Sequence, residues 1–250
     1  MSGHSKWHNI KLRKGKADAQ RGALFTKLSK EIILAAKGGS PDPEANYRLK
    51  MAVDKARENN MPQDNIKRAI GRATGADGAK EIEEMRYEGY GPAGVAVILE
   101  AATDNRNRTA AELRFLFSRH GGALGETGSV AWMFEPRGLL EVEQGRLNED
   151  QLTEAALVDG VVDVRYAADG ERSEIVTEPA ELAAGRERLA ANGLRGTSML
   201  LGVEPKQTVA PSGSEVREVV AFLDALEEHE DVQHVFSNAE LDLEQLEALA

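Results

Sequence analysis

Apolar residues recur at every third or fourth position through residues 21–75, which is the spacing of amphipathic helices. Gly38 and Gly39 end the first apolar segment. Asp42 and Pro43 are typical of an N-cap followed by the first residue of a second helix, and Pro62 opens a third. The apolar positions of the three segments are Leu24, Phe25, Leu28, Ile32 and Ala35, then Ala45, Leu49, Ala52, Val53 and Ala56, then Ile66, Ala69, Ile70 and Ala73. The pattern predicts a small three-helix domain over residues 21–78.

The period of the pattern changes after residue 80. Residues 85–90 and 94–103 are rich in strand-forming side chains, and the second stretch is almost continuously apolar. Thr109 and Glu112 have the spacing of a capping box, which predicts a helix that begins near Thr109. Apolar and polar residues alternate over residues 129–135, so a further strand is expected there.

The remaining pattern indicates one domain inserted into another. Beyond residue 136 we expect strand, helix, strand, strand, helix and strand over residues 139–142, 149–158, 161–166, 174–177, 179–191 and 194–203. This order is the βαββαβ unit of a ferredoxin-like domain. A helix over 214–228 and a strand over 232–236 are too little for a domain, but they can complete the elements of residues 82–135.

The predicted fold class is therefore α+β and multidomain. An N-terminal three-helix domain is followed by two ferredoxin-like α+β domains, the last inserted into the middle one. The expected boundaries are a basic N-terminal arm over 1–20, a helical domain over 21–78, a discontinuous α+β domain over 79–135 plus 206–250, and an inserted domain over 136–205.

Charge divides the chain into two parts. The formal net charge of the 250 residues is −11, yet residues 1–72 hold 16 Lys and Arg against 7 Asp and Glu. The other residues hold 15 against 35. A basic segment on an acidic body favours contact with a polyanion such as nucleic acid, whereas a solvated basic helix face is the alternative interpretation. We also expect a cytoplasmic protein, because no secretory signal and no apolar run long enough to span a bilayer is visible in the sequence.

No catalytic, metal or cofactor site is expected. The chain has no cysteine, which excludes disulfides and thiolate ligands. Residues 89–94 match the dinucleotide motif G-x-G-x-x-G, but strand-forming residues follow where that motif requires a helix, so we interpret them as a hairpin turn. His4 and His8 have the spacing of two helical metal ligands but lack a third ligand nearby.

Arg106 and Arg108 stand just before the predicted helix start at Thr109. Cations oppose the helix dipole at that end, whereas an anion bound there would be favoured by free N–H groups and by both guanidiniums. The alternative is that both arginines form ion pairs with acids of a neighbouring domain.

Several motifs together resemble those of the YebC/PmpR family, which includes a mitochondrial translational activator. The resemblance covers the whole chain and is densest up to about residue 135. The motifs are GHSKW at residues 3–7, RG at 21–22, FTK at 25–27, AVDKA at 52–56, NNMP at 59–62, YEGYGP at 87–92, DNRNRT at 104–109 and GSV at 128–130.

The resemblance implies a three-domain protein that is not an enzyme and regulates gene expression by binding nucleic acid. A DNA-binding transcriptional regulator is the main expectation. The alternatives are a ribosome-associated translation factor that contacts ribosomal RNA, a protein-only adaptor and an unrecognised hydrolase. We expect no membrane contact, and a monomer is favoured. The candidate nucleic-acid-binding residues are Lys6, Trp7, Lys11, Arg13, Lys14, Lys16, Arg21, Lys27, Lys55, Lys67, Arg68, Arg106 and Arg108.

Overall fold

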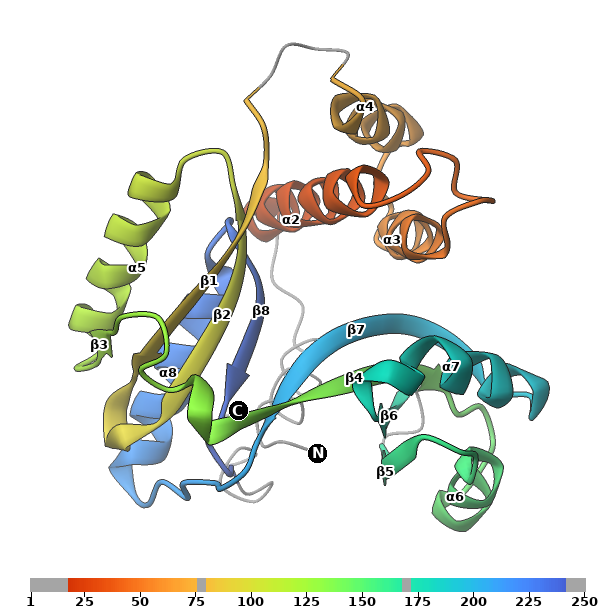
Figure 1. The fold of residues 1–250 in the computed structure, drawn as a ribbon. Helices are drawn as coiled ribbons and strands as arrows, with labels where there is room; N and C mark the ends of the chain where they lie inside the picture. Colours follow the sequence, from red (N-terminus) through yellow and green to blue (C-terminus); the bar gives the residue numbers. More distant parts are fainter. Residues whose placement is uncertain (1–17, 76–79, 168–171, 242–250) are drawn as a thin grey trace. The chain divides into compact units, whose positions relative to one another are not determined.

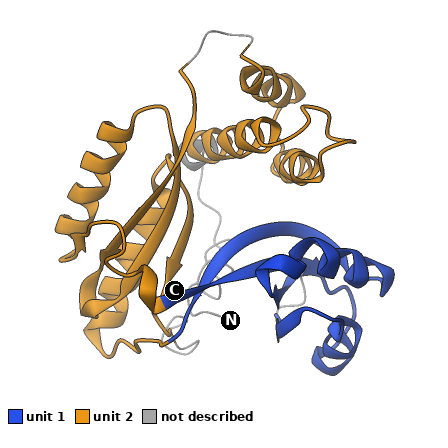
Figure 2. Cartoon of the chain, in the orientation of Figure 1, with its two compact units in different colours: residues 1, 134–206 blue, residues 2–133, 207–250 orange. Residues whose placement is uncertain are grey.

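The computed structural model describes residues 18–75, 80–167 and 172–241, with side chains from residue 22 onward (Figure 1). The described chain forms two compact units (Figure 2). One contains residues 134–206, and the other contains the segments before and after them. The α+β class and the insertion of one domain into another are thus confirmed.

The N-terminal helices are α2 (Asp18–Lys37), α3 (Tyr47–Glu58) and α4 (Gln63–Ala73). Their shared core contains Leu28, Ile32, Leu49 and Ile66, all almost fully buried. The expected start of the second helix at Pro43 is wrong. Asn46 is the N-cap, because its side-chain oxygen accepts the Leu49 N–H at 3.1 Å.

The middle domain has the strands β1 (Glu83–Tyr90), β2 (Ala96–Thr103), β3 (Ala123–Leu124) and β8 (Val232–Ser237) in the order β3-β1-β2-β8. All three pairings are antiparallel. The helices α5 (Arg106–Arg119) and α8 (Ser214–Glu228) cover one face of this sheet (Figure 1). The strand β8 follows the insertion and pairs with β2, which makes this sheet discontinuous in sequence.

The inserted unit contains β4 (Phe134–Glu143), α6 (Glu149–Ala156), β5 (Val161–Arg165), β6 (Arg172–Thr177), a 3-10 turn (Pro179–Glu181), α7 (Leu182–Ala191) and β7 (Arg195–Pro205). Its strand order, β5-β6-β4-β7, is that of a ferredoxin-like sheet. The middle sheet does not share this order, because its first two strands are hairpin neighbours at its centre.

Residues 129–135 do not form one strand as expected. Residues Ala131–Met133 are a 3-10 turn, and β4 starts at Phe134 in the other sheet. The cause is the buried Glu88, whose carboxylate accepts the N–H groups of Gly128, Val130 and Ala131 at 2.9 Å each. Burial raises the pKa of Glu88, but these three bonds outweigh it and the pKa is lowered. The N–H groups bound to Glu88 cannot serve a strand pairing.

The glycines of residues 89–94 serve packing in a hairpin. The 3-10 turn Pro92–Gly94 connects β1 to β2. A Cβ on Gly89 would lie 2.5 Å from the Phe117 ring, and one on Gly91 would lie 2.3 Å from the Phe222 ring. These rings meet edge to face at 5.0 Å in the core beneath the turn. No helix follows that could hold a pyrophosphate at its N-terminus, because the chain continues into β2.

Candidate nucleic-acid interface

Lys67 and Arg68 lie on the outer side of α4. Ile66 and Ala69 of the same helix are buried, so the neighbouring positions 67 and 68 turn toward solvent. Both cations are exposed, and no hydrogen bond or ion pair joins either to another residue of the described chain. Gln63 lies one turn before Lys67 and is also exposed.

Two other predicted cations of the helical domain are engaged. Lys27 on α2 donates through its ammonium group to the backbone oxygen of Glu227 at the end of α8. Lys55 on α3 forms an ion pair with Glu31 at 3.1 Å. Arg21 lies in α2, but its side chain is outside the described residues, as are Lys6, Trp7, Lys11, Arg13, Lys14 and Lys16 altogether.

The arginine pair lies inside α5, not before it. The helix begins at Arg106, three residues earlier than expected, because the Asn105 side chain caps it by accepting the Arg108 N–H at 3.2 Å. Arg106 forms an ion pair with Glu83 on β1, and Arg108 binds Asp231, which precedes β8, at 2.9 Å. Both carboxylates belong to the middle domain itself.

Asp231 is the centre of this arrangement, and its side chain is fully buried. Its carboxylate accepts hydrogen bonds from Lys30 of α2, from the Arg108 guanidinium and from the Thr109 hydroxyl at 2.6 Å. Burial alone would raise the pKa of Asp231, but the bonds from Lys30, Thr109 and Arg108 lower it to about 2. The sequence does not single out Asp231, because an aspartate between a helix and a strand looks like an ordinary turn residue.

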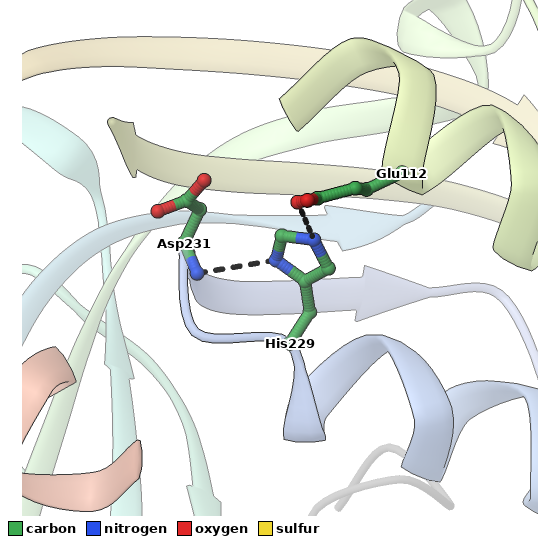
Figure 3. A group of neighbouring side chains, drawn as sticks. All are labelled: Glu112, His229 and Asp231. Atoms are coloured by element: carbon green, nitrogen blue, oxygen red, sulfur yellow. Dashed lines mark hydrogen bonds and ion pairs between the residues drawn. The ribbon is translucent and has the colours of Figure 1, made fainter. Parts of the chain in front are cut away.

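Glu112, His229 and Asp231 lie close enough to raise the question of a metal site (Figure 3). The His229 Nδ1 accepts the backbone N–H of Asp231 at 3.1 Å, and its Nε2 lies 3.1 Å from the Glu112 carboxylate. The Asp231 carboxylate points away from the imidazole (Figure 3) and is neutralised by Lys30 and Arg108. This set does not fit a divalent cation, which would need that carboxylate as a free ligand. His4 and His8 lie outside the described residues.

Of the predicted cations whose side chains the structure describes, Lys67 and Arg68 on α4 are thus the two without a partner in the described chain. The fold defines a multidomain α+β protein in which a helical domain with an outward-facing basic helix joins a discontinuous sheet domain. Within the described residues, no helix has the length and apolar character needed to cross a membrane.

The chain belongs to the TACO1/YebC family. Residues 5–76 match the family model described as the TACO1/YebC protein N-terminal domain, and residues 82–239 match the model described as the TACO1/YebC second and third domain. This confirms the family resemblance given by the motifs.

Similar proteins match this chain over its whole length. A protein of Rubrobacter xylanophilus is 49% identical over 251 residues, which is 100% of each chain. One of Moorella thermoacetica is 50% identical over 96% of each chain, and both are named probable transcriptional regulatory protein. The crystal structure of a conserved hypothetical protein, Aq1575, from Aquifex aeolicus has a TM-score of 0.82 at 42% identity, over 91% of this chain and 93% of that one.

Proposed function

We propose that this protein regulates gene expression by binding nucleic acid, with duplex DNA as its target, through the outer side of α4. The observation that carries the proposal is the exposed pair Lys67 and Arg68, which no carboxylate of the described chain neutralises. The names of the relatives, probable transcriptional regulatory protein, support the same class of function.

The chemistry of this surface suits a phosphate backbone. Lys67 offers three N–H donors and Arg68 offers five, and neither forms another bond within the described chain. Phosphate contacts fix position and supply affinity, whereas base contacts supply specificity. The exposed amide of Gln63, one turn away, can donate to and accept from base edges in a major groove. The proposed function needs no cofactor and no catalytic step.

The proposal is tested by Lys67→Ala combined with Arg68→Ala, using fluorescence anisotropy on duplex DNA over a range of salt concentrations. Loss of two phosphate contacts should reduce the slope of log K against log salt by about 1.8, from about 0.9 per contact. The free energy of unfolding should change by less than about 0.5 kcal/mol, because both side chains are exposed.

The matched control is Lys50→Ala combined with Arg57→Ala on α3. It removes the same charge from the same domain, but Lys50 pairs with Glu44 and Arg57 pairs with Asp54, each at 3.1 Å. An equal loss of slope in both double variants would contradict the proposal. If DNA binding is unchanged and binding to ribosomal RNA falls, the target is RNA and the translational alternative replaces the DNA one.

A further inference from the structure

Few apolar side chains of the middle domain join the core of the helical domain. The apolar core of the helical domain includes only two buried side chains from the middle domain within the described residues, Ile82 and Ala102. Ile82 immediately precedes β1, and Ala102 lies near the end of β2. Apolar packing is non-directional, and two side chains, one of them an alanine, define a relative orientation poorly. Polar contacts must therefore set that orientation.

Most of the ion pairs between the two domains are exposed. Lys37 of α2 pairs with Glu81, and Arg48 of α3 pairs with Glu84 at 3.3 Å. The carboxylates of these two pairs are 69% and 61% exposed, so water and salt screen them. Such pairs hold long, flexible side chains only weakly in one geometry.

The pair of Lys30 and Asp231 is different, because its side chains are 11% and 0% exposed. The Lys30 ammonium also donates to the backbone oxygen of Glu230 at 3.0 Å, so two neighbouring residues before β8 hold it. On the other side, Arg108 and the Thr109 hydroxyl fix the Asp231 carboxylate. Thr109 in turn hydrogen-bonds the Thr103 hydroxyl at 2.8 Å, which ties the site to the end of β2.

We propose that Lys30 and Asp231 are positioning residues that hold the helical domain at one angle on the middle domain. A buried charge has few alternatives to its partner, so any rotation of α2 would leave Lys30 without compensation. Asp231 keeps Arg108 and Thr109 when Lys30 is removed, so the middle domain remains satisfied by itself. Lys30 is thus the half of the pair that acts only between domains.

The pair also determines where the proposed nucleic-acid contacts stand. Lys67 and Arg68 belong to the helical domain, and α4 packs on α2, the helix that carries Lys30. The angle of α2 on the middle domain therefore sets the position of both cations relative to that domain. This consequence rests on the proposed function, whereas the positioning of the domains does not.

A distance measurement between spin labels tests the proposal without nucleic acid. The chain has no cysteine, so Gln63→Cys on α4 and Glu218→Cys on α8 give two unique labels at exposed positions. In the otherwise unchanged protein we expect one narrow distance distribution. Lys30→Met keeps the apolar stem but removes the charge, and it should at least double the width of the distribution with helix content unchanged by circular dichroism.

The matched control is Lys37→Met, which removes an exposed cation of the same helix that also reaches the middle domain. It should leave the distribution narrow, and Lys30→Arg should restore most of the narrow distribution. A narrow distribution in Lys30→Met would overturn the proposal. So would a loss of helix content in that variant, because Lys30 would then be required for folding and not for positioning.

Failure here is distinguishable from failure of the proposed function. The distance experiment contains no nucleic acid, and the anisotropy experiment changes Lys67 and Arg68 only. A protein with a rigid angle can still bind DNA through α4, and a protein with a loose angle can fail to bind it.

Discussion

Helices α4 and α5 each carry two closely spaced cations, and the two pairs differ in whether they have carboxylate partners. Lys67 and Arg68 on α4 reach solvent without a carboxylate partner in the described chain. Arg106 and Arg108 on α5 are bound by Glu83 and Asp231. The two pairs look alike in sequence, and both were expected to contact a polyanion. The difference shows that a cation is available to a ligand only where the fold has not already supplied an anion.

The difference arises from the elements that lie beside each helix. The first turn of α5 lies beside β1 and the segment before β8, and each presents a carboxylate to it. The outer side of α4 has no sheet beside it, and Asp64 is the acid in its first turn. The cations of α5 thus complete the middle domain, whereas those of α4 have no carboxylate partner in the described chain, as the proposed function requires.

Among the changes that test this comparison, removal of the Asp231 carboxylate should have the largest effect on the free energy of unfolding. Asp231→Ala leaves Lys30 and Arg108 without their shared partner, so we expect a loss of about 3–5 kcal/mol in the free energy of unfolding. Urea denaturation measures it. Asp231→Asn should lose less, because an amide oxygen still accepts hydrogen bonds. A loss below 1 kcal/mol for the alanine variant would show that the cations of α5 do not depend on this carboxylate.

Acid should remove the same contribution in the unchanged protein. The pKa of Asp231 is lowered from 3.8 to about 2, so its stabilisation is present above pH 4 and disappears as the pH falls toward 2. The difference in unfolding free energy between the unchanged protein and Asp231→Asn should therefore shrink by about 2 kcal/mol over this range. Urea denaturation at pH 5, 4, 3 and 2 measures the trend. A difference that stays constant down to pH 2 would mean that the pKa is not lowered.

Arg108→Ala should have a smaller effect, because Lys30 still compensates Asp231. We expect a loss of roughly 1.5 kcal/mol in unfolding free energy and no change in affinity for nucleic acid. Arg106→Ala is the control. It removes the same charge from the same turn, but Arg106 is 63% exposed, so the loss should stay below about 1 kcal/mol. Unchanged stability with weaker DNA binding in Arg108→Ala would restore these arginines as an anion site.

Patterns with a regular period predicted the fold well. The stripe through Leu28, Ile32 and Leu49 gave the helical domain, and the βαββαβ order gave the inserted sheet. Boundaries set by one side chain were less predictable. Asn46 and Asn105 displaced two helix starts, because capping depends on which polar side chain reaches the free N–H groups. Glu88 abolished an expected strand through three bonds from residues 40 to 43 positions away, which no local pattern contains.

In the candidate site, too, features set by a local period were predictable and features set by distant residues were not. Solvent exposure of Lys67 and Arg68 follows from their place opposite Ile66 and Ala69 in a helical period, which the sequence contains. The hydrogen bond that engages the Arg108 guanidinium is accepted by the carboxylate of Asp231, which lies 123 positions further along the chain. A pairing across that separation, on the far side of an inserted domain, exists only once the chain has folded.

The insertion couples the folding of residues 134–206 to the folding of the middle sheet, and this coupling does not require contact between them. The chain enters the inserted unit at Phe134 and leaves it at Pro205, and these residues are direct partners in one ladder. While that unit is folded, residues 134–205 add almost nothing to the length of the loop between β2 and β8. Once it unfolds, the loop that this pairing must close more than doubles in length, at an additional entropic cost of about 0.7 kcal/mol. Folding of the inserted unit thereby stabilises the middle sheet through chain connectivity alone.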